Sequence, residues 1–236
     1  MRSFHWWRTV FYLIPAVSLY TIVLGSISLV STLFDRTGNV AHGCARTWAR
    51  WILRTTGVRV RTTGLEQLEP GRSYVFAANH QSIYDIPILF ASIPFQLRIV
   101  AKDSLGRIPF MGWHLRRAGH LLVDRRHPGA DIVQKMRRLV GESSSLIVFP
   151  EGTRSVDGTV GRFKKGTFLA ATDAGLPVVP VSISGSRHVM RKGRLMVCPG
   201  EVELAVHAPI PTEGIDRHAV RAFASDVNDV VRSDAR

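Results

Sequence analysis

Residues 74–90 read YVFAANHQSIYDIPILF, and this stretch decides the kind of fold that the chain can adopt. The apolar run at 74–78 is typical of a buried strand, and the apolar residues after Asp85 are typical of a helix. Between them lies NHQSIYD, which contains His80 and Asp85. By spacing alone, this pair fits either a catalytic base with its orienting acid or an ordinary polar turn.

The same alternation continues along the rest of the chain. Apolar, β-branched runs predict strands within 73–79, 97–102, 119–124, 145–151, 178–185 and 201–207. Helices are predicted between and after them, at 82–92, 110–118, 129–142, 164–175 and 216–232. Strands that alternate with helices of this length predict an α/β domain with a mixed, largely parallel sheet flanked by helices. We assign this domain to residues 57–236.

The N-terminal segment, residues 1–56, has a different composition. Residues 9–34 form a run of 26 residues without a charged side chain. At about 1.5 Å per residue, a helix of this length can cross a hydrocarbon core of roughly 30 Å. Two interpretations stay open: a single membrane span, or a shallow insertion that is broken near Pro15 or Gly25. Arginines flank both ends of the run, so the charge distribution does not orient it.

The stretch that follows predicts an amphipathic helix. One face carries apolar and small residues: Ala41, Cys44, Ala45, Trp48 and Ile52. Another carries a basic stripe: His42, Arg46, Arg50 and Arg54. This pattern suits a helix in the lipid interface, and it also suits a helix packed on its own domain with a solvated basic face. Together with the uncharged run, it predicts a membrane-associated helical element over residues 1–56.

Charge and cysteine content restrict the class of partner and compartment. Lys and Arg outnumber Asp and Glu by 31 to 18, and the net charge is +13. This balance favours anionic partners, such as nucleic acid, anionic lipid, or phosphorylated and acidic substrates, without choosing among them. Cys44 and Cys198 lie far apart and lack the spacing of a zinc or redox motif. They are predicted to be free thiols in a reducing compartment.

Polar residues gather where three predicted strands end, at 79–85, 124–126 and 151–155. Open α/β sheets bind their ligands beyond the carboxyl ends of the strands. If Gln81 or Ser82 caps the following helix, Asp85 can hold one ring nitrogen of His80 and leave the other free to accept a proton. The chain has no G-x-S-x-G motif, so the pair fits direct deprotonation of a substrate hydroxyl better than covalent catalysis.

The second cluster, FPEGTRS at 149–155, combines a tight turn with anion-binding groups. Gly152 lets the backbone approach a ligand closely, Arg154 offers a fork of donors suited to phosphate, and Thr153 can add a hydroxyl. The alternative is a surface turn with a Glu151–Arg154 ion pair. The stretch GRFKKGT at 161–167 lacks a lysine after Gly166, which excludes a nucleotide-hydrolysing phosphate loop.

Four ordered motifs together carry a resemblance to a known family. They are NHQSIYD (79–85), KDSLGRIPFMGW (102–113) leading to GHLLVDR (119–125), FPEGTRS (149–155) followed by FKKG (163–166), and VVPVSIS (178–184). In order and spacing they resemble the glycerolipid acyltransferases, and among these the bacterial 1-acyl-glycerol-3-phosphate acyltransferases. The resemblance covers about residues 60–190. It implies that His80 is the catalytic base and Asp85 its partner. It also implies a substrate-binding set: Lys102, Arg125, Glu151, Gly152, Thr153 and Arg154.

The resemblance further implies an activity. An acyl group would pass from acyl-CoA or acyl-carrier protein to the sn-2 hydroxyl of 1-acyl-glycerol-3-phosphate, giving phosphatidic acid, with no cofactor and no metal. The implied partners are a lysophospholipid acceptor, the acyl donor and membrane lipid, without nucleic acid. The implied location is the inner (cytoplasmic) membrane, with the catalytic domain on the cytoplasmic side.

Two alternatives and one question stay open. The acceptor of the same chemistry could be glycerol-3-phosphate, another lysophospholipid or a lyso-ornithine lipid. A basic, non-catalytic protein that binds membranes or nucleic acid would also account for the charge, but not for the motifs. The sequence leaves the oligomeric state open.

Overall fold

The computed structural model describes residues 2–35, 37–108, 111–123, 131–141 and 143–235. A seven-stranded sheet with the order β1-β7-β6-β2-β5-β3-β4 forms its centre. The strands are β1 (Val58–Thr63), β2 (Val75–Ala78), β3 (Gln96–Lys102), β4 (Leu121–Val123), β5 (Ser144–Val148), β6 (Val178–Ser184) and β7 (Gly200–Val206). The neighbouring strands from β6 to β4 run parallel, whereas β7 is antiparallel to β6 and parallel to β1. The predicted mixed, largely parallel sheet is confirmed.

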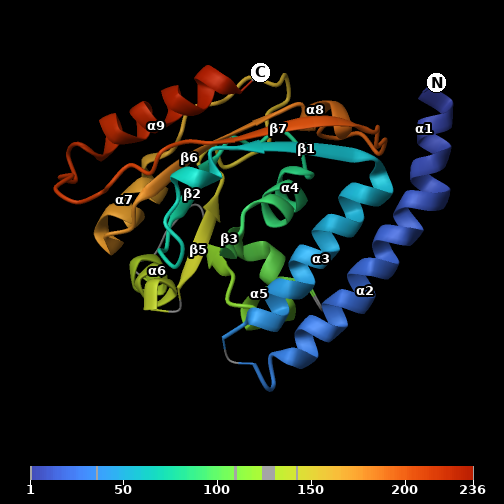
Figure 1. Cartoon of the computed structure of the whole chain (residues 1–236), viewed down its shortest axis with the longest axis horizontal. Helices are drawn as coiled ribbons and strands as arrows, with labels where there is room; N and C mark the ends of the chain where they lie inside the picture. Colours follow the sequence, from blue (N-terminus) through green and yellow to red (C-terminus); the bar gives the residue numbers. More distant parts are fainter. Residues whose placement is uncertain (1, 36, 109–110, 124–130, 142, 236) are drawn as a thin grey trace.

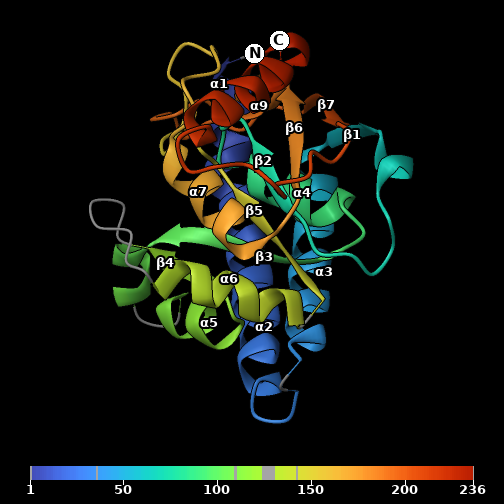
Figure 2. The ribbon, with the colours of Figure 1, turned by 90° about the vertical axis from the view of Figure 1, so that its left-hand side faces the viewer.

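Helices cover both faces of this sheet (Figures 1 and 2). One face is covered by α2 (Ile14–Ser31), α3 (Asn39–Thr56) and α4 (Asp85–Ser92). Those on the other face are α6 (Asp131–Gly141), α7 (Lys165–Ala174) and α9 (Val220–Asp234). Shorter helices are α1 (Arg2–Arg8), α5 (Met111–Arg117) and α8 (Ser186–Val189), with single turns η1 (Thr9–Leu13), η2 (Leu65–Gln67) and η3 (Asp103–Arg107).

Alternation along the strands divides the core into two layers. In β2, Phe76 packs in the cluster shared with α3 and α4, whereas Val75 packs in the cluster shared with α6, α7 and α9. Both layers are needed because successive strand side chains point to opposite faces of a sheet. The centre of the sheet is therefore dry on both sides, and its polar chemistry is confined to the strand ends.

One strand was not predicted, and two helices begin clearly later than predicted, of which the one predicted at 216–232 spans Val220–Asp234. β1 was not predicted, because it is an edge strand whose sequence, VRVRTT, has a polar, partly exposed face instead of a continuous apolar run. The helix predicted at 82–92 begins only at Asp85, and neither Gln81 nor Ser82 caps it. Instead, the Asp85 carboxylate turns back and accepts the amides of Gln81 and Ser82, which keeps these two residues in a turn.

The basic stripe of α3 is only partly solvated. Arg50 and Arg54 are exposed, but His42 is half-buried and its Nδ1 atom accepts the amide of Leu97 at 3.3 Å. Ala49, Ile52 and Leu53 of α3 belong to the core beneath the sheet. Most of the apolar face of α3 is thus occupied by protein, although Val40 and Trp51 stay exposed. The rest of the exposed apolar surface of the N-terminal element lies on α1, η1, α2 and the turn that follows α2.

Helices α1, η1 and α2 run on from one another beside α3 (Figure 1). The stretch Ser3–Ser31 is long and apolar enough to cross a membrane, judged by length and composition alone. Pro15 cannot supply a backbone N–H, and the π-helical turn η1 ends at Leu13, two residues before it. The helix continues through Gly25 without interruption. One side of α2 is bonded to the protein, for example Trp48 Nε1 to Thr21 Oγ1 at 3.0 Å and Tyr20 to Thr55 at 3.1 Å.

Candidate active site

The predicted His80–Asp85 pair forms at the carboxyl end of β2. Nδ1 of His80 lies 2.7 Å from Oδ2 of Asp85, whose carboxylate is fully buried. The same Oδ2 accepts the backbone amides of Gln81 and Ser82 at 2.8 and 2.9 Å. An ionised carboxylate only accepts hydrogen bonds, so Nδ1 of His80 is the donor in this contact. Nε2 is then the nitrogen with the free lone pair, as a general base requires.

The ring of His80 is held from a second direction by Phe149. The two rings stack with their centroids 4.0 Å apart and an angle of 18° between their planes. Phe149 follows β5, which pairs with β2 in parallel, so both residues leave the sheet at the same edge. The stack and the Asp85 bond together restrict both torsions of the imidazole, while 16% of its side-chain surface stays accessible.

Glu151 connects the loop after β2 to the loop after β5. Its Oε1 atom accepts the amide of His80 at 2.7 Å, and its Oε2 atom accepts the amide of Gly161 at 2.8 Å. Burial raises the pKa of this carboxyl, and the two backbone bonds oppose that rise. The alternative interpretation, an ion pair between Glu151 and Arg154, is not the arrangement found, because both oxygens of Glu151 are engaged by backbone amides. Glu151 therefore shapes the backbone around His80.

The turn after Glu151 is tied to the same histidine. The amide of Ser155 donates to the carbonyl of His80 at 2.7 Å. Gly152 has a φ of 76°, in the left-handed region, and a Cβ atom there would lie 2.9 Å from Nζ of Lys164. Any other residue would strain the backbone and meet this ammonium. Within the described part of the chain, the guanidinium of Arg154 has no carboxylate partner, so it remains available to an anion.

The remaining predicted substrate-binding residues lie further out. Lys102 ends β3, which is separated from β2 by β5 but finishes at the same edge, and its side chain is exposed. Arg125 lies outside the described residues, as does the polar stretch 124–126 after β4. The structure thus brings together His80, Asp85 and the 151–154 turn and leaves Lys102 at their periphery.

Several positioning residues carried no assigned role in the sequence. Asn79 and Phe149 lie inside the quoted motifs, but composition gives no hint that one bonds to β6 and the other stacks on the imidazole. Lys164 lies in the FKKG motif, and the structure places its ammonium beside Gly152. Lys192 lies outside every motif, yet its Nζ atom bonds Thr153 Oγ1 at 3.1 Å and the carbonyl of Arg154 at 2.8 Å. Only folding could reveal that contact.

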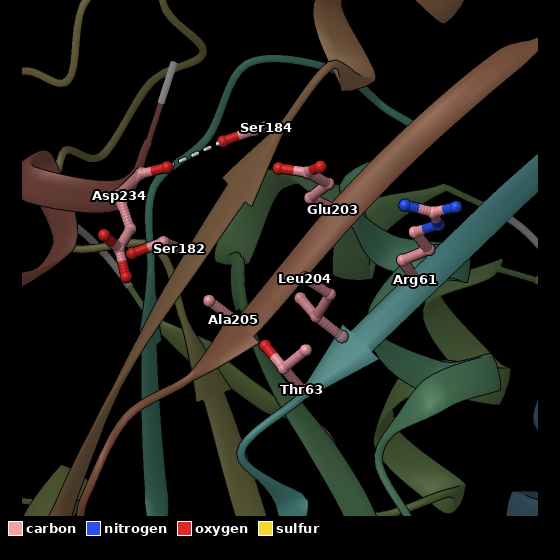
Figure 3. Close-up of a pocket in the computed structure, with 8 residues that line it drawn as sticks. All are labelled: Arg61, Thr63, Ser182, Ser184, Glu203, Leu204, Ala205 and Asp234. Carbon is pink, nitrogen blue, oxygen red and sulfur yellow. Dashed lines mark hydrogen bonds between the residues drawn. The ribbon is translucent and has the colours of Figure 1, made fainter.

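A serine, a histidine and an aspartate also meet beside a different cavity, whose lining includes Ser182 and Asp234 (Figure 3). This hollow of about 440 Å³ is lined by β1, β6, β7 and the end of α9. Ser182 Oγ and Asp234 Oδ2 both approach the same ring atom, Nε2 of His207, at 2.8 and 3.8 Å. Ser182 also donates to the carbonyl of Val231 at 3.0 Å. A triad requires the acid and the serine on opposite ring nitrogens, so this group fastens α9 to the sheet.

The described residues contain no group of three or more His, Cys, Asp or Glu side chains that could hold a metal ion. The chemistry that remains at the β2–β5 edge is a buried acid, a histidine with one free nitrogen, and several nearby cations. These groups can remove a proton from a hydroxyl whose molecule carries a negative charge.

Comparison with known proteins identifies the family of the chain. The family model described as "Acyltransferase" matches residues 59–184, which include every motif of the site. The chain belongs to this acyltransferase family. Among its relatives, a 1-acyl-sn-glycerol-3-phosphate acyltransferase from Chlamydomonas reinhardtii is 37% identical over 68% of this chain and 50% of the relative. One of the same name from Saccharomyces cerevisiae is 31% identical over 86% of this chain and 68% of the relative.

The fold of this acyltransferase is also found in a solved structure. The crystal structure of PlsC, the 1-acyl-sn-glycerophosphate acyltransferase from Thermotoga maritima, has a TM-score of 0.84 and 28% sequence identity. The match covers 99% of this chain and 95% of that chain, including the N-terminal helices. By contrast, the chain spans about half the length of several curated relatives that it matches, such as 50% for the algal protein and 53% for one from Brassica napus.

Proposed function

We propose that this acyltransferase moves an acyl group from acyl-CoA or acyl-carrier protein to the sn-2 hydroxyl of 1-acyl-glycerol-3-phosphate. The product is phosphatidic acid. The observation that carries the proposal is the 2.7 Å bond from His80 to a buried Asp85, beside a turn in which Arg154 has no carboxylate partner among the described residues. Relatives and a structural neighbour whose names contain this activity support the choice of acceptor.

The mechanism follows from the orientation of His80. Nε2 accepts the proton of the acceptor hydroxyl as its oxygen attacks the thioester carbonyl. The tetrahedral intermediate then expels the thiolate, which takes the proton back from the imidazolium. No enzyme nucleophile is required, because the acceptor oxygen itself forms the new ester bond. Asp85 keeps the proton of the neutral ring on Nδ1 and stabilises the transient imidazolium. General-base catalysis by a well-placed histidine raises the rate roughly 10²–10⁴-fold.

The cations around the site would bind the negative charges of both substrates. Arg154 can hold the phosphate of the acceptor through paired donors. Lys102 and the backbone amides of Thr153 and Arg154 are the donors at this edge that can face the oxyanion of the intermediate, because the amides of Gly152 and Ser155 already bond the carbonyls of Phe149 and His80. The net charge of +13 favours the phosphates of CoA or an acidic carrier protein as donor, and it favours anionic lipid as surroundings.

We further propose that α1 and α2 insert into one leaflet and do not span the bilayer. The outer face of α2 is strongly apolar and exposed, as at Ile22 and Val30, while the opposite face bonds to α3 and α5 along its length. A span would require these bonds to break or the domain to enter the lipid. Acyl-CoA and acyl-carrier protein are cytoplasmic, so the proposed location is the cytoplasmic side of the inner membrane.

The test offers the purified protein a panel of acceptors with acyl-CoA and acyl-carrier protein in parallel. The acceptors are lysophosphatidate, glycerol-3-phosphate, lysophosphatidylcholine and a lyso-ornithine lipid, with thiol release and product mass as readouts. We expect transfer to lysophosphatidate and its loss in His80→Ala. Transfer to a different acceptor alone would overturn the acceptor assignment. Full activity of His80→Ala would overturn the mechanism, and no transfer at all, together with salt-sensitive binding, would favour a non-catalytic protein.

A further inference from the structure

The segment 186–198 links the two loops that carry the candidate active site. It contains α8 and the extended turn that leads to β7 (Figure 1). On one side, Oγ of Ser82 in the loop after β2 donates to the carbonyl of Met190 at 2.8 Å. On the other side, Nζ of Lys192 donates to Thr153 Oγ1 at 3.1 Å and to the carbonyl of Arg154 at 2.8 Å, in the turn after β5.

The backbone on both sides of Lys192 is anchored. Before it, Met190 is held by Ser82, which is fully buried. After it, the amide of Val197 donates to Oγ1 of Thr9 in η1 at 3.0 Å, and both residues are buried. An exposed lysine usually loses much side-chain entropy when it is fixed in one position. Here the backbone is already fixed, so only the Lys192 side chain has to be ordered, and the entropy cost is lower.

From these contacts we propose that Lys192 is a positioning residue for the acceptor site. By holding the Thr153 hydroxyl and the Arg154 carbonyl, its ammonium sets the turn from which the Arg154 guanidinium faces the phosphate of the acceptor. This inference rests on the proposed function, because it takes a lysophosphatidate phosphate as the group that Arg154 binds. Lys192 acts through the turn and does not touch the substrate.

Charge supports the same assignment. An ammonium group has three donors, and two of them are used within the turn. A second ammonium group, that of Lys164, lies beside Gly152 in the same turn. The only carboxylate of the turn, Glu151, is occupied by the amides of His80 and Gly161. The two ammonium groups therefore also raise the positive potential at the place where a phosphate would bind.

The kinetic test compares Lys192→Ala with Arg194→Ala. Arg194 is an exposed cation in the same segment, and among the described residues its side chain forms no hydrogen bond or ion pair with either active-site loop. We expect Lys192→Ala to raise KM for lysophosphatidate about tenfold with kcat changed less than about twofold, because binding geometry is lost and the base is intact. Arg194→Ala should leave both constants unchanged. Equal KM increases in the two variants would indicate a general charge effect and overturn the proposal.

A double-mutant cycle tests whether the effect passes through the turn. Thr153→Val keeps the shape of residue 153 but removes the oxygen that Lys192 bonds. If Lys192 acts through this contact, Lys192→Ala should raise KM only about threefold in the Thr153→Val background. Fully additive effects would overturn the part of the proposal that runs through the Thr153 hydroxyl and leave only the bond to the Arg154 carbonyl, which the exchange experiment tests.

Hydrogen exchange provides a readout that needs no substrate. The amides of residues 152–155 should exchange at least about fivefold faster in Lys192→Ala than in the wild-type protein or in Arg194→Ala. Unchanged exchange would overturn the proposal even if KM rose. If the wild-type protein transferred no acyl group to lysophosphatidate, the proposed function would fail, and the exchange experiment would still decide whether Lys192 orders the turn.

Discussion

Asn79 holds Ile183 through both ends of its side-chain amide: Nδ2 donates to the carbonyl at 2.9 Å, and Oδ1 accepts the amide at 2.7 Å. The last backbone pair between β2 and β6 joins Ala78 to Val181. The Asn79 side chain therefore replaces the next step of the ladder at the point where the main chain leaves the sheet. Because the side chain takes the place of a backbone pair, His80 can turn toward β5 without leaving buried backbone groups of β6 unsatisfied.

Asn79→Asp should destabilise the protein and reduce its activity. The carboxylate keeps the shape of the amide but cannot donate to the carbonyl of Ile183, and it places a charge at a fully buried position. An unsatisfied buried group costs about 1–3 kcal/mol, and more when it is charged. Thermal unfolding of the wild-type protein and the variant checks this expectation. Asn39→Asp, at an exposed position in α3, is the matched control and should not lower the melting temperature.

Asp85→Asn should lower kcat about 10²–10⁴-fold while the fold is kept. The amide group of the variant can present N–H to Nδ1 of His80, which favours the tautomer with its proton on Nε2 and removes the free lone pair of the base. Steady-state rates with saturating acceptor measure the loss. The exposed Asp229→Asn on α9 is the control. Wild-type turnover in Asp85→Asn would mean that this carboxylate does not orient the base.

Glu151→Gln should loosen the connection between the two active-site loops. Glutamine keeps one acceptor oxygen, but its NH2 group faces an amide donor, either that of His80 or that of Gly161. Loss of one charge-assisted bond with repulsion at the second predicts a kcat/KM lower by roughly two orders of magnitude. Faster hydrogen exchange of the Gly161 amide should accompany it. Glu213→Gln, which changes an exposed carboxylate, should show neither effect.

The protein should lose stability as the pH falls below about 6.5. Burial, reinforced by the charges of Arg98 and Arg46, lowers the pKa of His42 to about 4. His120 keeps a partly exposed edge, yet burial, followed by the charges of His114, Arg98 and His42, lowers its pKa to about 3. Both pKa values lie below that of an unfolded histidine. Their stabilising contribution is therefore complete above pH 6.5 and decreases toward pH 4, by up to about 1.4 kcal/mol per pH unit for each group.

His120→Asn provides the test of this pH dependence. Nδ1 of His120 accepts the amide of Ile99 at 3.1 Å, and the side-chain oxygen of asparagine can take over that bond without titrating. Melting temperatures recorded from pH 7.5 to pH 4.5 should fall less steeply for this variant than for the wild-type protein. His218→Asn removes an exposed histidine and should leave the slope as it is. Parallel slopes for all three proteins would show that His120 is not the group that titrates.

Membrane binding should depend on the exposed face of α2. Leu19 and Ile22 are 58% and 66% exposed, and each would contribute roughly 1.5–3 kcal/mol if buried in lipid. Leu19→Glu and Ile22→Glu should each weaken binding to vesicles at least about tenfold in a sedimentation assay. Ala222→Glu adds the same charge to the exposed side of α9, across the sheet from α2, and should bind like the wild type. Equal loss in all three variants would indicate that charge alone, and not this face, governs binding.

Much of the fold could be predicted from the sequence because parallel strands and amphipathic helices leave strong local patterns. The run at 75–78 is buried on both faces and reads as continuous apolar sequence. β1 escaped prediction because only one of its faces is covered, which leaves a short mixed pattern. The helix that begins at Asp85 was predicted to begin at residue 82. The Asp85 carboxylate accepts amides of the preceding turn, and the residue types alone do not show which amides a carboxylate binds.

By itself, the sequence determined the fold class and the strand ends at which polar residues gather, and its motifs pointed to the His80–Asp85 pair and to the proposed anion-binding turn at 151–155. These depend on local periodicity and on motifs whose members lie a few residues apart. Only the tertiary structure decided that Glu151 binds backbone amides instead of Arg154, that Phe149 stacks on His80, and that Lys192 holds the 153–154 turn. Glu151 is 71 residues from His80 along the chain, and Lys192 is 38 residues from Arg154. Such contacts arise from the order of strands in the sheet, which local sequence patterns do not contain.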